Sequence, residues 1–195
     1  LRRLSPIVPP RERRADRGQT EADRPDPATQ IHQDGRPAPM SGLEDLYREI
    51  ILDHYRSPRN RGELPVPPAI RTEGLNPLCG DEIVVYLELD DPSKGDDATI
   101  TDLRIGGQGC SISQSSASMM SAAVKGKSVD EIRNLVRRFK HMMSIEEEDE
   151  TAPPLDESKP LGDLEALRGV VKFPVRIKCA TLAWNTLLDG LSQSN

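Results

Sequence analysis

NPLCGD, residues 76–81, is the stretch around which the rest of the sequence is arranged. It places the thiol of Cys79 and the carboxylate of Asp81 two residues apart across a glycine. A run rich in Ile, Val and Tyr follows at 82–89 and is typical of a β-strand. Because proline and glycine flank the cysteine, we expect Cys79 to lie in a turn that leads into this strand.

Two further strands are expected around 82–89. Residues 69–74 precede the turn, and residues 99–105 follow an eight-residue connection, 90–97, that contains Pro92 and Gly95. Such a short connection joins antiparallel strands as a hairpin does. The economical arrangement is therefore a three-stranded antiparallel sheet.

Helical patterns lie on both sides of the expected sheet. The apolar spacing predicts a helix at 42–56 with Ser41 as its N-cap, and another that starts after Ser128. Further helices are expected at 110–125, 161–167 and 178–191, and acidic residues 144–160 form a loop. The fold class is therefore α+β, with a three-stranded antiparallel sheet packed against several helices.

The composition differs between the two ends of the chain. Residues 1–39 hold eight Arg, six acidic residues and seven Pro without apolar periodicity, so we expect a disordered leader there. A compact pattern begins at Met40, which is consistent with an over-extended start of the reading frame, and residues 40–195 are expected to form one domain.

Charge and apolar content exclude two classes of partner. The net charge of −6 disfavours nucleic acid, and no run reaches the roughly 18 apolar residues of a membrane span. Three cysteines without a signal peptide favour a reducing, cytoplasmic location with free, catalytic or metal-bound thiols.

Cys79, Cys110 and Cys179, with Asp81, could close a tetrahedral zinc site of three thiolates and one carboxylate. The 31- and 69-residue gaps between the cysteines do not decide the matter, since three buried cysteines can also act as small hydrophobic residues. Asp81 can equally cap backbone amides in its turn. The local context favours thiolates, because Cys110 follows glycines at a predicted helix start and Cys179 lies at another, beside Arg176.

Two other features that could suggest a ligand site have simpler structural interpretations. Residues 106–109 (GGQG) lack the third glycine of the dinucleotide fingerprint, so we interpret them as permissive backbone that brings Cys110 close to its neighbours. His54 shares a helix with core residues and is expected to be a packed ring rather than a metal ligand.

Five blocks in this order carry a resemblance to a known superfamily: LYREIILDHY (46–55), NPLCGD (76–81), GQGCSIS (107–113), ASMM (117–120) and RIKCA (176–180). With them the chain resembles the U-type iron–sulfur cluster assembly proteins, the superfamily of IscU and the NifU N-terminal domain. Within it, the chain is most similar to the SufU-type zinc-dependent sulfurtransferases. Lys178 stands where scaffold-type members carry a histidine, and residues 162–176 match a segment typical of the SufU type.

The resemblance implies an IscU-like fold in which Cys79, Asp81, Cys110 and Cys179 bind Zn²⁺. It implies a sulfurtransferase-like relay in iron–sulfur cluster biogenesis, a co-substrate of a pyridoxal-phosphate-dependent cysteine desulfurase of the SufS kind. Cys79 would accept the sulfur as a persulfide and pass it to a downstream iron–sulfur scaffold, and Arg176 is our candidate for docking or for contact with the charge of the site.

Two alternatives stay open at this stage. In one, the chain is an iron–sulfur cluster assembly scaffold on which the same ligands hold iron or a nascent [2Fe–2S] cluster. In the other, it is a structural zinc domain that only mediates contacts.

Overall fold

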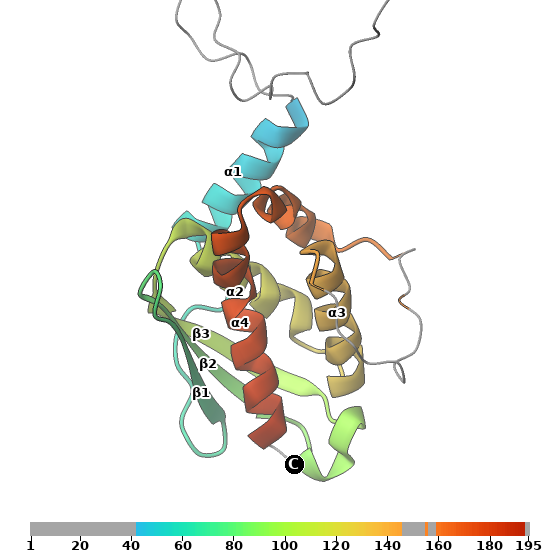
Figure 1. The fold of residues 1–195 in the computed structure, drawn as a ribbon. Helices are drawn as coiled ribbons and strands as arrows, with labels where there is room; N and C mark the ends of the chain where they lie inside the picture. The colour runs from blue at the N-terminus through green and yellow to red at the C-terminus, as the bar shows by residue number, and fades with distance from the viewer. Residues whose placement is uncertain (1–41, 146–154, 156–158, 194–195) are drawn as a thin grey trace, which may run out of the picture. The chain divides into compact units, whose positions relative to one another are not determined.

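The computed structural model describes residues 42–145, 155 and 159–193, and within them the predicted α+β fold is confirmed. The sheet consists of β1 (Ile70–Asn76), β2 (Asp81–Leu89) and β3 (Ile100–Gln108), in the order β1-β2-β3 and antiparallel throughout (Figure 1). Asn76 pairs with Asp81, so the turn that carries Cys79 closes the β1–β2 hairpin.

The long central strand extends both of its neighbours beyond the predicted ends. β2 spans nine residues, and β3 pairs with it as far as Gln108, three residues past the predicted end. The connection 90–97 contains a 3-10 helix, η3 (Pro92–Asp97), whose N-cap Asp91 accepts the backbone N–H of Ser93. Proline at the first helical position and an aspartate before it favour this turn over an open loop.

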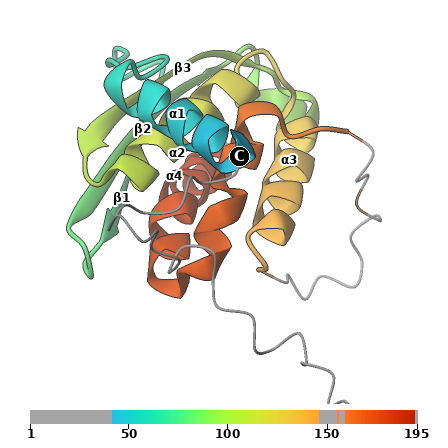
Figure 2. The same ribbon diagram turned by 90° about the horizontal axis from the view of Figure 1, so that it is seen from above.

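The helices are α1 (Gly42–Arg56), α2 (Ser111–Val124), α3 (Val129–Met142), η4 (Gly162–Lys172, 3-10) and α4 (Pro174–Gln193). α2 and α4 lie on one face of the sheet, α4 against β1 and β2 and α2 against β3 (Figure 2). The sheet contributes fully buried aliphatic residues such as Leu87, and the helices contribute Phe139 and Trp184, whose rings stack at 4.4 Å. These two residues are the largest fully buried side chains among the described residues.

α4 lies close to the sheet because two positions lack side chains. A Cβ at Gly74 would collide with Thr186 Oγ1, and a Cβ at Gly190 would lie 2.6 Å from Leu87 Cδ2. Thr72 Oγ1 also donates a hydrogen bond of 3.0 Å to the carbonyl of Thr186. These contacts fix the position of α4, which carries Cys179, relative to β1.

α1 is anchored through a buried histidine. The ring of His54 lies 2.8 Å from Ser118 Oγ in α2 through Nδ1 and 3.2 Å from Asp163 Oδ2 in η4 through Nε2. The backbone N–H of Arg59 donates to the same Ser118 Oγ at 2.8 Å. The prediction of a packed ring is therefore confirmed.

Helix boundaries confirm some predictions and correct others. α1 has the predicted bounds, and Ser128 caps α3 with a full capping box involving Glu131. The element expected at 161–167 is a longer 3-10 helix, and α4 begins at Pro174 instead of residue 178 because proline suits the first helical position.

Several expectations concern residues outside the described part of the chain: the disordered leader 1–39, the cap at Ser41 and most of the loop 144–160. Within the described part, none of the helices combines the length and the apolarity needed to cross a membrane.

Candidate metal centre

The turn at 77–80 is built by Asn76. Its carbonyl accepts the N–H of Gly80 at 2.8 Å and that of Cys79 at 3.3 Å, and its side-chain Oδ1 accepts the N–H of Leu78 at 3.2 Å. Gly80 adopts a φ of +69°, which glycine tolerates without strain. The turn leaves Cys79 exposed at its tip.

Asp81 begins β2 and points its carboxylate at the start of α2. The carboxylate is buried, with Oδ1 accepting the backbone N–H of Cys110 at 2.7 Å and Oδ2 lying 3.5 Å from Cys110 Sγ. Burial raises the pKa of Asp81, but hydrogen bonds from Cys79, the Cys110 backbone and Cys179 outweigh it and lower the pKa overall. Asp81 therefore stays ionised while it touches groups on three elements.

The glycines before Cys110 make this approach possible. Gly107 has a φ of +100°, and a Cβ there would collide with the carbonyl of Glu82 on the neighbouring strand. A Cβ at Gly109 would lie only 2.6 Å from Asp81 Oδ1. The interpretation of residues 106–109 as permissive backbone is thus supported, and Cys110 becomes the exposed N-cap residue of α2.

Cys179 differs from its predicted setting. Since α4 begins at Pro174, this cysteine lies in the second helical turn and is 4% exposed, so the expected location at a helix start is wrong. Burial raises the pKa of its thiol, and hydrogen bonds to Asp81 and Cys79 add to this effect. Without a bound cation, Cys179 is therefore held as a thiol rather than as a thiolate.

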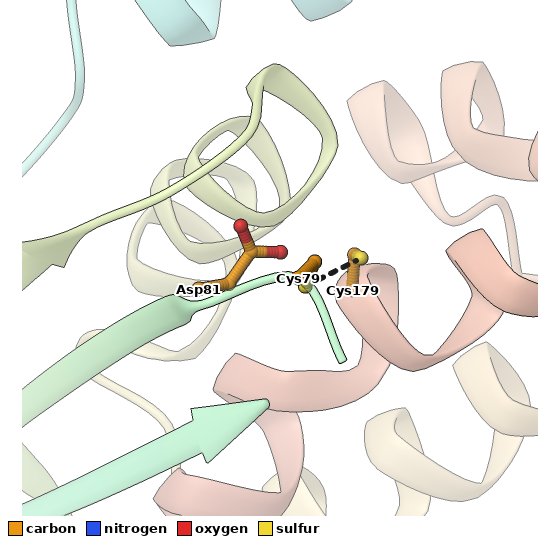
Figure 3. A group of neighbouring side chains, drawn as sticks. All are labelled: Cys79, Asp81 and Cys179. Atoms are coloured by element: carbon orange, nitrogen blue, oxygen red, sulfur yellow. Dashed lines mark hydrogen bonds between the residues drawn. The ribbon is translucent and has the colours of Figure 1, made fainter. Parts of the chain in front are cut away.

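The sulfur of Cys179 faces the turn. Its side chain points toward that of Cys79, as Figure 3 shows, and the two Sγ atoms are 3.5 Å apart. The Nδ2 amide of Asn76 donates to Cys179 Sγ at 3.7 Å. Asn76 therefore both shapes the turn that carries one cysteine and contacts the sulfur of the other. Asn76 is not among the site residues predicted from the sequence, although Asn-Pro at the start of a turn is a recognisable signal.

The spacing of these groups fits a zinc ion. Two thiolates on a tetrahedral Zn²⁺ at ~2.3 Å would lie about 3.8 Å apart, and a thiolate and a carboxylate oxygen about 3.5 Å apart. Cys79, Asp81 and Cys179 offer ligand atoms that all lie within 4.8 Å of one another. Thiolates and a carboxylate are donors that zinc accepts, so the residues fit the group.

Cys110 borders this compact set. Its sulfur contacts Asp81 Oδ2 at 3.5 Å, the separation expected of two ligands on one ion, but it is not among the atoms that lie within 4.8 Å of each other. The structure brings together three of the four predicted ligands and places the fourth against one of them. That Cys79, Asp81, Cys110 and Cys179 bind an ion remains a prediction for all four.

Cations and apolar side chains are exposed on the segments next to the turn and at the start of α4. Arg176 and Lys178 are exposed on the first turns of α4, and the guanidinium of Arg176 lies 5.4 Å from the centroid of the Phe173 ring. Four large apolar side chains are more than half exposed, a set we call the apolar rim: Leu75 in β1, Leu78 in the turn, Phe173 just before α4 and Val175 in its first turn. The predicted role of Arg176 stays a prediction.

Fold and site together define a small α+β domain in which cysteine and aspartate side chains from a hairpin turn, the start of β2 and α4 lie close together. Residues 46–191 match the family described as the NifU-like N terminal domain, and the chain belongs to this family.

The chain is similar to particular members of known function. It is 44% identical over 153 residues to the zinc-dependent sulfurtransferase SufU of Bacillus subtilis (strain 168), covering 78% of this chain and 94% of that protein. It is 38% identical over 155 residues to the iron–sulfur cluster assembly scaffold protein IscU of Streptococcus pyogenes serotype M1, covering 80% and 88%.

A solved structure has the same fold. The crystal structure of a candidate iron–sulfur cluster assembly scaffold protein for the SUF system, from Fervidobacterium islandicum AW-1, has a TM-score of 0.61 at 31% identity. The match covers 77% of this chain and 99% of that one.

Proposed function

We propose that this chain is a zinc-dependent sulfur-transfer protein of iron–sulfur cluster biogenesis, which receives sulfur from a cysteine desulfurase as a persulfide on Cys79 and passes it on. One observation carries the proposal: Cys79 is exposed, whereas Cys179 and Asp81, the other members of the compact ligand set, are buried. A sulfur acceptor has to reach another protein, and within this compact set of three only Cys79 is open to solvent.

Cys79, Asp81, Cys110 and Cys179 would hold the zinc ion. Bound zinc would keep the sulfurs deprotonated, which offsets the raised pKa of Cys179. The chain supplies the rest: Asp81 is oriented by the Cys110 amide, and Asn76 donates to the sulfur of Cys179. The turn at 77–80 lies outside the regular strand pairing, so Cys79 can move without disturbing either helix.

The partner is a pyridoxal-phosphate-dependent cysteine desulfurase of the SufS kind, and the apolar rim supports a protein partner at this place. Large apolar side chains exposed on the segments that carry a reactive group, or that adjoin it, are typical of a surface that another protein covers. Arg176 lies beside Phe173 in this rim and is positioned to pair with an acidic group of that partner. The downstream recipient is an iron–sulfur scaffold protein. Three free cysteines support a reducing compartment as the place of action.

The scaffold function is the second candidate, because the IscU of Streptococcus pyogenes is 38% identical to this chain. The residue before the last cysteine distinguishes the sulfur-transfer function from the scaffold function. Lys178 is an exposed cation and offers no imidazole to a cluster, which favours sulfur transfer over cluster assembly.

The test measures persulfide and metal in the same sample. The full chain is purified, its zinc and iron are quantified, and it is incubated with a desulfurase and cysteine. We expect about one zinc per chain and a gain of about 32 Da on the peptide with Cys79. Cys110 and Cys179, mapped in the same digest, serve as internal controls.

Two variants and one alternative outcome make the test decisive. Cys79→Ala should lose the adduct, and Arg176→Ala should lower the rate of loading while zinc stays bound. A stable [2Fe–2S] spectrum after anaerobic reconstitution, with no adduct on Cys79, would replace this proposal by the scaffold function. A Cys79→Ala chain that still accepts persulfide sulfur would refute the assignment of the acceptor.

A further inference from the structure

The two sulfurs of the site lie close enough to react with each other. Cys179 Sγ is 3.5 Å from Cys79 Sγ, which is the separation at which reacting atoms stand before a bond forms. If Cys79 carries a persulfide, its own Sγ is the inner sulfur of that group. The thiol of Cys179 is then the nearest one to the inner sulfur and needs no rearrangement to reach it. Cys110, whose sulfur contacts Asp81 and Ser113, lies outside this compact pair.

We propose that Cys179 is a resolving thiol, which attacks the inner sulfur of a Cys79 persulfide and releases the outer sulfur as hydrosulfide. This inference rests on the proposed function, because it needs a persulfide on Cys79. It adds a second fate for that sulfur, since the product leaves as reduced sulfide instead of being handed to another thiol.

The step balances without an outside reactant. A bond forms between Cys179 Sγ and Cys79 Sγ, and the bond between Cys79 Sγ and the outer sulfur breaks. The outer sulfur leaves with the electron pair as hydrosulfide, and the proton of the Cys179 thiol passes to hydrosulfide or to water. The outer sulfur is reduced by two electrons, and the two cysteine sulfurs are oxidised to a disulfide.

The position of each cysteine favours attack at the inner sulfur. The measured distance of 3.5 Å joins Cys179 Sγ to that sulfur itself. Hydrosulfide is the conjugate base of a stronger acid than a cysteine thiol, so it is the better leaving group. The side-chain amide of Asn76 donates to Cys179 Sγ and so stabilises the negative charge that this sulfur gains as it loses its proton.

The unequal exposure of Cys79 and Cys179 determines how their disulfide is reduced again. Cys179 is 4% exposed and Cys79 lies at the tip of the turn, so an external dithiol reaches the disulfide only from the side of Cys79. A dithiol reductant of the thioredoxin class supplies the two electrons and frees Cys179 first. The released hydrosulfide would then be used by a reaction whose substrates are sulfide and iron, and not by one that needs a persulfide.

The experiment loads Cys79 in a way that does not depend on the desulfurase. The full chain, as purified, is treated with glutathione persulfide, desalted, and followed in buffer with a metal chelator, so that no ion holds either sulfur. The chain mass, the released sulfide and the linked peptides are measured over time. A parallel sample is loaded by a desulfurase and cysteine.

We expect the adduct of about 32 Da to disappear as about one equivalent of sulfide appears, leaving a chain about 2 Da lighter than the reduced form. The digest should contain the peptide pair joined by Cys79 and Cys179. Cys179→Ser should keep the adduct, and its rate of sulfide release should be at least roughly tenfold lower than that of the unchanged chain. Thr181→Ser, a conservative change one half-turn further along α4, should behave as the unchanged chain.

Three results would overturn the inference, and they differ from failure of the proposed function. Sulfide release by Cys179→Ser at the rate of the unchanged chain would do so, as would a linked peptide that joins Cys79 to Cys110. A stable adduct on the unchanged chain would also refute it, without reliance on any variant. If the desulfurase fails to load Cys79 but the chemically loaded chain releases sulfide as described, the proposed function fails and the resolving role of Cys179 stands.

Discussion

Gly109→Ala tests the architecture of the site without altering any proposed ligand. A Cβ at this position would lie 2.6 Å from Asp81 Oδ1 and 2.7 Å from Ser113 Oγ, closer than real Cβ atoms approach their neighbours. The carboxylate has to move away, because the backbone of residue 109 is fixed between β3 and α2. Moving it breaks the hydrogen bond of 2.7 Å from the Cys110 N–H to Asp81.

The size of the effect follows from that bond. A hydrogen bond to a charged group contributes ~1.5–3 kcal/mol, so the free energy of unfolding of the metal-free chain should fall by at least this amount, because alanine must also adopt the φ of +157° at this position. Loss of a partner that orients a metal-bound carboxylate weakens metal binding by roughly 10- to 100-fold, and we expect a loss of that size in zinc affinity.

The assay is competition for zinc against a chromophoric chelator, with urea unfolding of the metal-free protein beside it. Gly106→Ala is the matched control: it lies on the same strand, and its Cβ would meet Val84 Cβ at 3.6 Å, an ordinary contact. If Gly109→Ala binds zinc within roughly twofold of Gly106→Ala, the carboxylate does not depend on this contact and the reasoning is wrong.

Three further predictions concern the rest of the fold. His54→Ala removes a buried ring with two hydrogen-bond partners and should lower the free energy of unfolding by about 2–4 kcal/mol in urea titrations, whereas Asp163→Ala, on an exposed side chain, should cost far less. Asp102→Asn should destabilise the protein at pH 7, since the hydrogen bond from Lys125 lowers the pKa of Asp102 in the folded state. This contribution is complete above the ordinary value of 3.8 and is lost as the pH falls through the lowered pKa, so an unchanged difference between the two chains in acid would contradict it. Ser128→Ala removes the cap of α3 and should cost ~1 kcal/mol, against no measurable change for Ser192→Ala; equal unfolding midpoints would argue against the cap.

Local patterns were sufficient to predict most of the fold. The bounds of α1 and the cap at Ser128 follow from apolar spacing and capping chemistry within a few residues. The three strands were predicted in the right order, but their ends were not, because pairing with β2 extends β1 and β3 beyond what their own residues favour. The start of α4 had a local signal, Pro174, that the apolar stripe of residues 178–191 obscured.

The candidate site was predictable in composition and less so in environment. The turn around Cys79 and the glycines before Cys110 are visible in the sequence, and resemblance linked them to Cys179 and Asp81. Burial of Cys179, and with it the raised pKa of that thiol, depends on how α4 packs against the sheet. The contact from Asn76 to Cys179 joins residues 103 positions apart, which no short-range pattern encodes.

The absence of side chains at Gly74 and Gly190 has a consequence for redesign of this domain. With β1 and α4 held at fixed separation, the helical cysteine cannot follow a change made on the hairpin. The length of the turn and the residues at 77, 78 and 80 can therefore be varied to tune how far the sulfur of Cys79 reaches, while Gly74 and Gly190 have to be kept where β1 and α4 pack together. A library restricted to those three positions, with Cys79 unchanged, would sample reach alone, at nearly constant core packing.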